Sequence, residues 1–235
     1  CWSLGVAPES MRAMLEIAQQ NSQRLSHLIN DLLDMDKLAA GKLSFELTNL
    51  GLAAELEEAV SCNQSYANQH QVALQLDPIP VLQVRADALR LQQVLSNFLS
   101  NAIKFSPSGG HVRMHTTLRD GRVRVSVTDQ GSGIPEHFRS HIFHKFSQAE
   151  SGDQRQKGGT GLGLAISKEL IERMGGLIGF DSQEGHGGTF WFELAVLVVH
   201  TTPPDLLLAN ILVVDDEAPI RAMLAQMLET EGYEV

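Results

Sequence analysis

The sequence LQQVLSNFLSNAIKF, from Leu91 to Phe105, decides the fold of the central part of this chain. Its apolar residues recur at intervals of three and four, as they do on the buried face of a helix. These residues are Leu91, Val94, Leu95 and Phe98. Asp87 precedes the stretch and is a good N-cap residue, so we predict a helix from Asp87 to about Lys104 that packs one face against a core.

The same helix has a polar face. Asn97 and Asn101 are four residues apart, so both amides leave one side of the helix, and Lys104 follows one turn later. An asparagine carbonyl is a hard oxygen ligand that suits Mg²⁺, which takes its other ligands from water and from substrate phosphates. This face is a candidate site for phosphates and magnesium, although paired asparagines taken alone are more often only solvated.

Strands and further helices are predicted on both sides of this helix, from their hydrophobic periods and their turn residues. The predicted elements are a strand at Leu43–Leu47, a helix at residues 52–70, strands at Gln71–Leu76, His111–Leu118 and Arg122–Asp129, a helix at Leu162–Met174, and strands at Leu177–Asp181 and Thr189–Leu197. Arg119-Asp120-Gly121 is typical of a tight hairpin turn. The mixture predicts an α+β domain.

A carboxylate and two glycines follow the second strand of this hairpin, in the hexapeptide DQGSGI from Asp129 to Ile134. A carboxylate accepts hydrogen bonds, so Asp129 could accept one from the exocyclic amine of adenine. The glycines would let the backbone approach a flat ring. A plain surface turn is the alternative for this hexapeptide taken alone.

A second glycine run, GGTGLGL from Gly158 to Leu164, leads into a predicted helix whose free N–H groups and dipole suit a phosphate. It matches neither the dinucleotide-binding spacing nor a P-loop. The polar stretch Gln148–Lys157 before it, with Arg155 and Lys157, could close over the phosphates as a lid or simply be solvated.

A fourth motif, GHGGTF from Gly185 to Phe190, opens the last predicted strand with small residues and the hydroxyl of Thr189. As a hairpin turn it would need no function. The order of the four motifs along one domain is far more specific than any one of them.

Together these motifs resemble the ATP-binding domain of sensor histidine kinases, over about Gly41 to Val198. The resemblance makes Leu91–Phe105 the N box, Asp129–Ile134 the first glycine box, Ile142–Phe146 the F box and Gly159–Leu164 the second glycine box. It implies that Asn101 holds magnesium, that Asn97 and Lys104 contact phosphates, and that Asp129 and Thr189 recognise adenine. The ATP site implied in full is Asn97, Asn101, Lys104, Phe105, Asp129, Gly131, Gly133, Ile134, Phe146, Lys157, Gly159, Thr160, Gly161, Leu162, Gly163, Leu164 and Thr189.

The resemblance also implies a domain plan. Residues 1–41, with an apolar seam of coiled-coil spacing from Met14 to Met35, look like the second helix of the dimerisation and phosphoacceptor hairpin; an ordinary core-facing helix is the alternative. Residues 42–198 are the ATP-binding domain, an α+β two-layer sandwich with a mixed sheet. Residues 199–210 are a linker, and residues 211–235 look like the first βα unit of a doubly wound receiver domain, with Asp215 and Asp216 at its magnesium site.

The composition limits which partners and which cellular compartment we expect for this chain. A net charge of −10 argues against a nucleic-acid partner, and no apolar run reaches the roughly 18 residues that a membrane span needs. Cys1 and Cys62 are too few for a disulfide framework, so we expect a cytoplasmic location without membrane contact for these residues. Whether the parent protein is anchored in a membrane stays open.

The function expected from this resemblance is that of a hybrid sensor histidine kinase, which uses ATP and Mg²⁺ to phosphorylate a histidine and then a receiver aspartate. The histidine acceptor is expected upstream of these residues, because His27 is followed by Leu28 and lacks the family's pattern. The receiver aspartate is expected beyond Val235. The parent is expected to dimerise through the helical hairpin and to serve a receiver domain in cis or a separate response regulator. The alternatives are a non-catalytic ATP-binding interaction module and an ATP-hydrolysing clamp; the clamp needs a glutamate where this chain has Gln92 and Gln93.

Overall fold

The computed structural model describes residues 9–147, 160–197 and 223–224, with some side chains of the first helix left out. The chain separates into two compact units, Cys1–Leu197 and Val198–Val235, and the second is described only at residues 223–224. The predicted linker and receiver segment therefore lie outside the described residues, apart from those two positions. Among the helices that the structure describes, none is both long and apolar enough to cross a membrane.

A mixed seven-stranded sheet forms one layer of the first unit. Its strands are β1 (Thr48–Gly51), β2 (Ala73–Leu76), β3 (Gln83–Ala86), β4 (His111–Arg119), β5 (Arg122–Thr128), β6 (Leu177–Ser182) and β7 (Gly188–Leu197). The strand order is β1-β3-β7-β5-β4-β2, and β6 also pairs with β7. The pairing of β2 with β4 is parallel and the other pairings are antiparallel.

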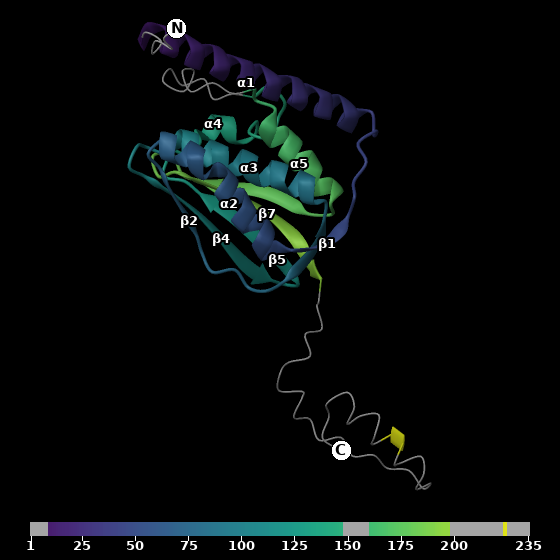
Figure 1. Cartoon of the computed structure of the whole chain (residues 1–235). Helices are drawn as coiled ribbons and strands as arrows, with labels where there is room; N and C mark the ends of the chain where they lie inside the picture. The colour runs from purple at the N-terminus through teal and green to yellow at the C-terminus, as the bar shows by residue number, and fades with distance from the viewer. Residues whose placement is uncertain (1–8, 148–159, 198–222, 225–235) are drawn as a thin grey trace, which may run out of the picture. The chain divides into compact units, whose positions relative to one another are not determined.

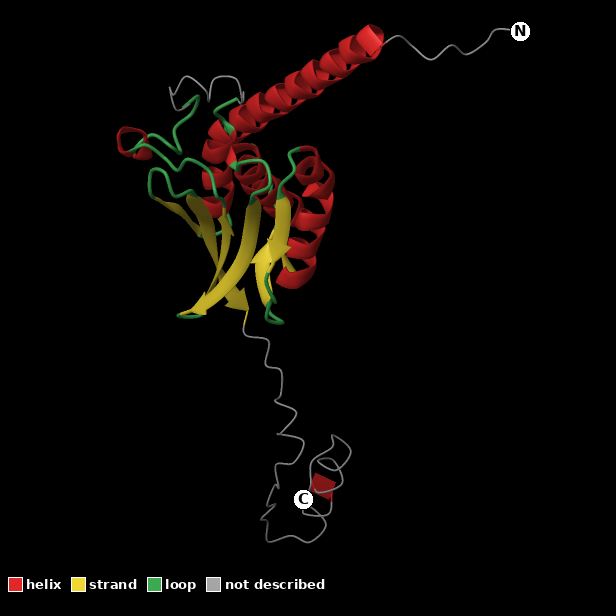
Figure 2. Cartoon of the chain, turned by 90° about the vertical axis from the view of Figure 1, so that its left-hand side faces the viewer, coloured by secondary structure: helices red, strands yellow, loops and turns green. Residues whose placement is uncertain are grey.

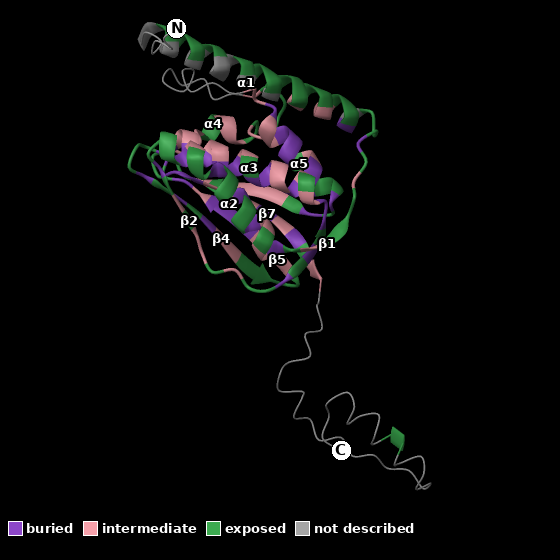
Figure 3. Ribbon diagram, viewed as in Figure 1, coloured by how far each residue is buried: buried purple, intermediate pink, exposed green. Residues whose placement is uncertain are grey.

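Three helices cover one face of this sheet: α2 (Leu52–Gln69), α3 (Ala88–Phe105) and α5 (Gly163–Arg173), as Figures 1 and 2 show. The core lies between the two layers, where alternate residues of β5 and β7 meet the apolar face of α3 (Figure 3). Phe98 of α3 contacts Phe190 and Phe192 of β7, with ring centroids 5.7 and 6.2 Å apart. The domain is thus the predicted α+β two-layer sandwich.

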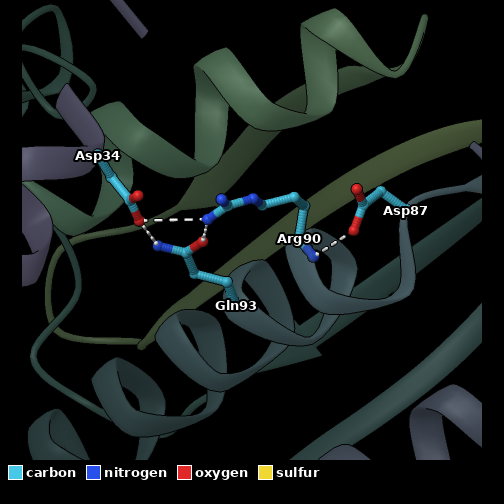
Figure 4. Close-up of polar contacts among 4 residues, drawn as sticks. All are labelled: Asp34, Asp87, Arg90 and Gln93. Carbon is cyan, nitrogen blue, oxygen red and sulfur yellow. Dashed lines mark hydrogen bonds and ion pairs between the residues drawn. The ribbon is translucent and has the colours of Figure 1, made fainter. Parts of the chain in front are cut away.

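The long helix α1 (Glu9–Ala39) contacts this domain through its C-terminal end. Leu38 is only 2% exposed, whereas four residues of the predicted seam are well exposed: Met14, Leu25, Leu28 and Leu32, at 71, 58, 40 and 52%. Close to the buried end, Asp34 Oδ2 accepts from Gln93 Nε2 at 2.9 Å and lies 3.3 Å from Arg90 Nη1 (Figure 4). The domain therefore covers the seam only at its C-terminal end, where Met35 packs against the core, and leaves its described residues from Met14 to Leu32 exposed.

The predicted helix and hairpin around the core are confirmed. Asp87 caps α3, because its carboxylate accepts from the backbone N–H of Arg90 at 3.1 Å (Figure 4). The turn between β4 and β5 has positive φ at both Asp120 (51°) and Gly121 (71°), as a tight hairpin requires.

The predicted strand at Leu43–Leu47 is wrong, because β1 begins only at Thr48. Leu43 is buried and Phe45 is half-buried between exposed neighbours, but Leu47 is exposed. The backbone N–H of Glu46 donates to Asp87 Oδ2 at 2.8 Å instead of to a strand. The sequence analysis also missed β3 and the one-turn helix α4 (Glu136–Arg139). Both are only four residues long, too short for a period to be read.

Candidate functional site

The carboxylate of Asp129 lies directly after β5 and is 9% exposed. Its Oδ1 accepts from the backbone N–H groups of Gly131 at 2.7 Å and Gly188 at 3.3 Å. Burial raises the pKa of Asp129 above its ordinary value, and these two hydrogen bonds partly oppose that rise. No described residue donates to Oδ2, so this oxygen is the one left to accept a hydrogen bond from a ligand.

Two glycines next to Asp129 are required by close contacts. A Cβ on Gly131 would lie 2.8 Å from Asp129 Oδ1 and 2.9 Å from the carbonyl oxygen of Phe105. Gly133 has φ +70°, and a Cβ there would lie 2.2 Å from the carbonyl oxygen of Gln183. The backbone of the first glycine box is therefore pressed against both the end of α3 and the turn after β6.

Serine and threonine hydroxyls hold the strands around this carboxylate. Ser182 Oγ accepts from the backbone N–H of Ile134 and donates to the carbonyl of Gly187, both at 2.9 Å. Thr189 Oγ1 lies 2.9 Å from Thr128 Oγ1 across the β5–β7 pairing. These bonds connect the first glycine box with the GHGGTF motif, so the structure brings two of the four predicted motifs together.

The two predicted amides of α3 form a second cluster with α5. Asn97 Nδ2 donates to Ser167 Oγ at 2.9 Å, and Asn97 Oδ1 accepts from Asn101 Nδ2 at 3.3 Å. Gly163, the first residue of α5, lies so close that a Cβ would be 2.4 Å from Asn97 Oδ1. Asn97 therefore connects α3 with α5, and Asn101 keeps its own carbonyl oxygen without a donor among the described residues.

The second glycine box leads into α5 as predicted. Thr160 Oγ1 accepts from the backbone N–H of Leu162 at 3.1 Å and donates to Asp31 Oδ2 of α1 at 2.9 Å. Gly161 has φ +69° and its carbonyl accepts from the backbone N–H of Phe146 at 2.9 Å. The glycine box is thus held between α1 and the end of the F box, at the N-terminus of α5.

The last turns of α3 join the two clusters. Phe105 reaches Gly131 with its carbonyl, and Asn101 and Asn97 lie one and two turns earlier on the same helix, about 6 and 12 Å back along its axis. Lys104 Nζ lies 4.8 Å from the centroid of the Phe105 ring. A ligand along this line would meet a carboxylate at one end and amides with a helix N-terminus at the other.

Some predicted site residues lie elsewhere or are not described. The Leu162 side chain is 2% exposed in the hydrophobic core, Leu164 packs against that core, and Phe146 is 67% exposed. The predicted residues Lys157, Gly159, Asp215 and Asp216 lie outside the described residues. In the described part of the chain, no three His, Cys, Asp or Glu side chains are grouped as a metal site.

Several contacting residues were not found from the sequence: Asp31, Thr128, Ser167, Ser182 and Gly188. Gly188 stood in a motif that had been singled out, but its N–H contact with Asp129 depends on the pairing of β5 with β7. The others are single hydroxyls or carboxylates without a local pattern, and only the packing of distant elements shows their partners.

Comparisons with known proteins agree with this geometry. Residues 86–197 match the family described as "Histidine kinase-, DNA gyrase B-, and HSP90-like ATPase". The circadian input-output histidine kinase CikA of Synechococcus elongatus is 33% identical over 247 residues, which cover 100% of this chain and 32% of CikA. This chain thus spans about a third of the length of that relative.

Two solved structures are similar as well. Full-length ShkA in complex with AMPPNP has a TM-score of 0.68 and 30% identity, over 97% of this chain and 48% of ShkA. The nucleotide-free catalytic domain of histidine kinase ThkA has a TM-score of 0.56 and 30% identity, over 64% of this chain and 96% of ThkA. The chain therefore belongs to the histidine kinase-, DNA gyrase B- and HSP90-like ATPases, and its central domain is the ATP-binding catalytic domain of a sensor histidine kinase.

Proposed function

We propose that this chain is the catalytic part of a hybrid sensor histidine kinase, which binds ATP with Mg²⁺ and passes its γ-phosphoryl group to a histidine and then to a receiver aspartate. The observation that carries the proposal is the Asp129 carboxylate, with one oxygen held by two backbone N–H groups and the other without a donor among the described residues. Such a group can accept from the amine of a purine in a domain of this family.

We assign the adenine to the cluster around Asp129 and the phosphates to the cluster between α3 and α5. Asp129 and Thr189 face the adenine, and the free N–H groups at the start of α5, near Gly161 and Gly163, face the phosphates. Asn101 holds Mg²⁺ through its carbonyl oxygen, and the bound ion neutralises phosphate charge. Phosphoryl transfer needs mainly positioning and charge neutralisation, so these residues supply the donor side of the reaction.

Dimerisation is proposed to occur through the open part of α1. Leu25, Leu28 and Leu32 expose 58, 40 and 52% of their surface, and a stripe of this size on one helix needs another helix to cover it. In the parent protein we assign this cover to the other helix of the hairpin and to the second subunit. The receiver is proposed to be the domain that begins near residue 211 and contains Asp215 and Asp216, or a separate response regulator.

The arrangement of α3 disfavours an ATP-hydrolysing clamp. Gln93 donates to Asp34 and Gln92 donates to Glu55, so both side-chain amides already have partners among the described residues. Neither is a carboxylate that could activate water.

Calorimetric titration of the chain with ATP and Mg²⁺ tests the proposal. We expect saturable binding of one nucleotide without steady release of inorganic phosphate. Steady multiple-turnover release would favour the clamp, and binding by a full-length parent that never labels a histidine would favour the interaction module. If the well-folded chain gives no heat of binding with ATP and Mg²⁺, the nucleotide site itself is refuted.

A further inference from the structure

A buried serine on α5 contacts the amide pair of α3. Ser167 is 2% exposed, and its Oγ accepts from Asn97 Nδ2 at 2.9 Å. It lies outside the second glycine box and one turn beyond Gly163, so it does not face the nucleotide directly in the proposed function. Its contact with the site passes through Asn97.

This contact determines how the Asn97 amide is oriented. A carboxamide has a donor nitrogen at one end and an acceptor oxygen at the other, and a half-turn exchanges them. With Nδ2 committed to Ser167, Oδ1 of Asn97 faces the other way, where it accepts from Asn101 Nδ2 at 3.3 Å. The orientation of the second amide therefore follows from that of the first.

The first residue of α5 makes room for this arrangement. A Cβ on Gly163 would lie 2.4 Å from Asn97 Oδ1 and 3.1 Å from Asn97 Nδ2, so only glycine lets the amide occupy this place. The amide is thus confined by the backbone of Gly163 on one side and by the hydroxyl of Ser167, four residues later, on the other. Both constraints come from α5, and neither comes from α3 itself.

We propose that Ser167 is a positioning residue for magnesium: the hydrogen-bonded series Ser167–Asn97–Asn101 holds the Asn101 carbonyl oxygen toward the Mg²⁺ of Mg-ATP. The inference rests on the proposed function, because it takes Asn101 as the magnesium ligand. Once Asn101 Nδ2 is bonded to Asn97, its Oδ1 is the free end of the amide, and a hard oxygen is what Mg²⁺ binds. An amide turned the other way would offer Mg²⁺ its NH₂ group, which cannot act as a ligand.

The test compares nucleotide affinity with and without metal. ATP is titrated into the chain in Mg²⁺ and in EDTA, and the ratio of the two dissociation constants gives the gain due to metal. For Ser167→Ala we expect this gain to fall about five- to tenfold, the effect of losing one orienting hydrogen bond. The dissociation constant in EDTA should stay within about twofold of the wild-type value, because the residues that hold adenine are unchanged.

Ser100→Ala is the matched control. Its hydroxyl also bonds to Asn97, but to the backbone carbonyl at 3.2 Å and not to the amide. This variant should keep the wild-type gain, because the Asn97 side chain retains both of its partners. Thermal unfolding of both variants shows whether they are folded.

The inference is overturned if folded Ser167→Ala keeps the wild-type gain. If the wild-type chain binds ATP equally well in Mg²⁺ and in EDTA, then Asn101 is not a magnesium ligand and the inference about Ser167 fails with it. A second measurement needs neither a variant nor a ligand: in ¹⁵N-edited NMR spectra of the nucleotide-free chain, the Nδ2 protons of Asn97 and Asn101 should exchange slowly with water. Fast exchange of both would also overturn the proposal.

Discussion

Replacing Asp129 by Asn should weaken the binding of ATP while leaving the free energy of unfolding almost unchanged. The Oδ1 position would remain a carbonyl that accepts from Gly131 and Gly188, now at 2.7 and 3.3 Å, while an NH₂ group would replace the free Oδ2. A donor would then meet the donor amine of adenine. A hydrogen bond to a charged group contributes about 1.5–3 kcal/mol, so we expect ATP affinity to fall about 10- to 150-fold.

The same substitution should change stability little. Burial raises the pKa of Asp129, so the folded chain bears a cost for the ionised carboxylate. Asn removes that cost and weakens two backbone hydrogen bonds, which leaves a net change in the free energy of unfolding of less than about 1 kcal/mol. Calorimetric titration with ATP and urea denaturation measure the two effects separately.

Asp77→Asn is the control for this experiment. Asp77 pairs with Arg113 at 2.6 Å on the β2–β4 side of the sheet, and the guanidinium lowers the pKa of its carboxyl. Its replacement should leave ATP affinity unchanged. If folded Asp129→Asn binds ATP as the wild type does, the assignment of Asp129 to adenine is wrong.

Three further predictions follow from the same geometry. As the pH falls, ATP affinity should weaken when Asp129 is protonated, which happens at a pH above the ordinary range of an Asp pKa because burial raises its pKa. Because the folded pKa is raised, the contribution of Asp129 to stability is largest in acid and is lost as the pH rises through that pKa. Unfolding curves across pH would show this loss. Gly133→Ala should cost at least about 2 kcal/mol in urea denaturation, from positive φ plus a clash with a carbonyl, and more than Gly185→Ala, which has positive φ but open space. Asp31→Asn should raise ATP affinity about two- to fivefold in calorimetry, because it removes a negative charge bonded to Thr160 beside the phosphate end; a decrease would show that this contact supports the site instead.

Local sequence signals were enough to predict those elements that have a hydrophobic period or a turn motif within their own residues. The apolar spacing of Leu91–Phe105 and the N-cap Asp87 predicted α3 because both act within one helix. Asp120-Gly121 predicted the β4–β5 hairpin because the turn conformation is a property of those residues. The failed strand at Leu43–Leu47 alternates in burial only as far as Phe45, and it has no partner strand, which no local pattern records.

The sequence also determined which residue types form the candidate site, since an acid after a strand, amides on one helix face and glycines before a helix all stand in local motifs. The tertiary structure alone decided which of their atoms stay available. The pairing of β5 with β7 directs the backbone N–H of Gly188 at the Asp129 oxygen that already accepts from nearby Gly131, and among the described residues the other oxygen has no donor. The packing of α5 against α3 gives Asn97 its partner Ser167, seventy residues away. Hydrogen-bond partners of this kind depend on distances between elements far apart in the chain, and only the folded chain sets those distances.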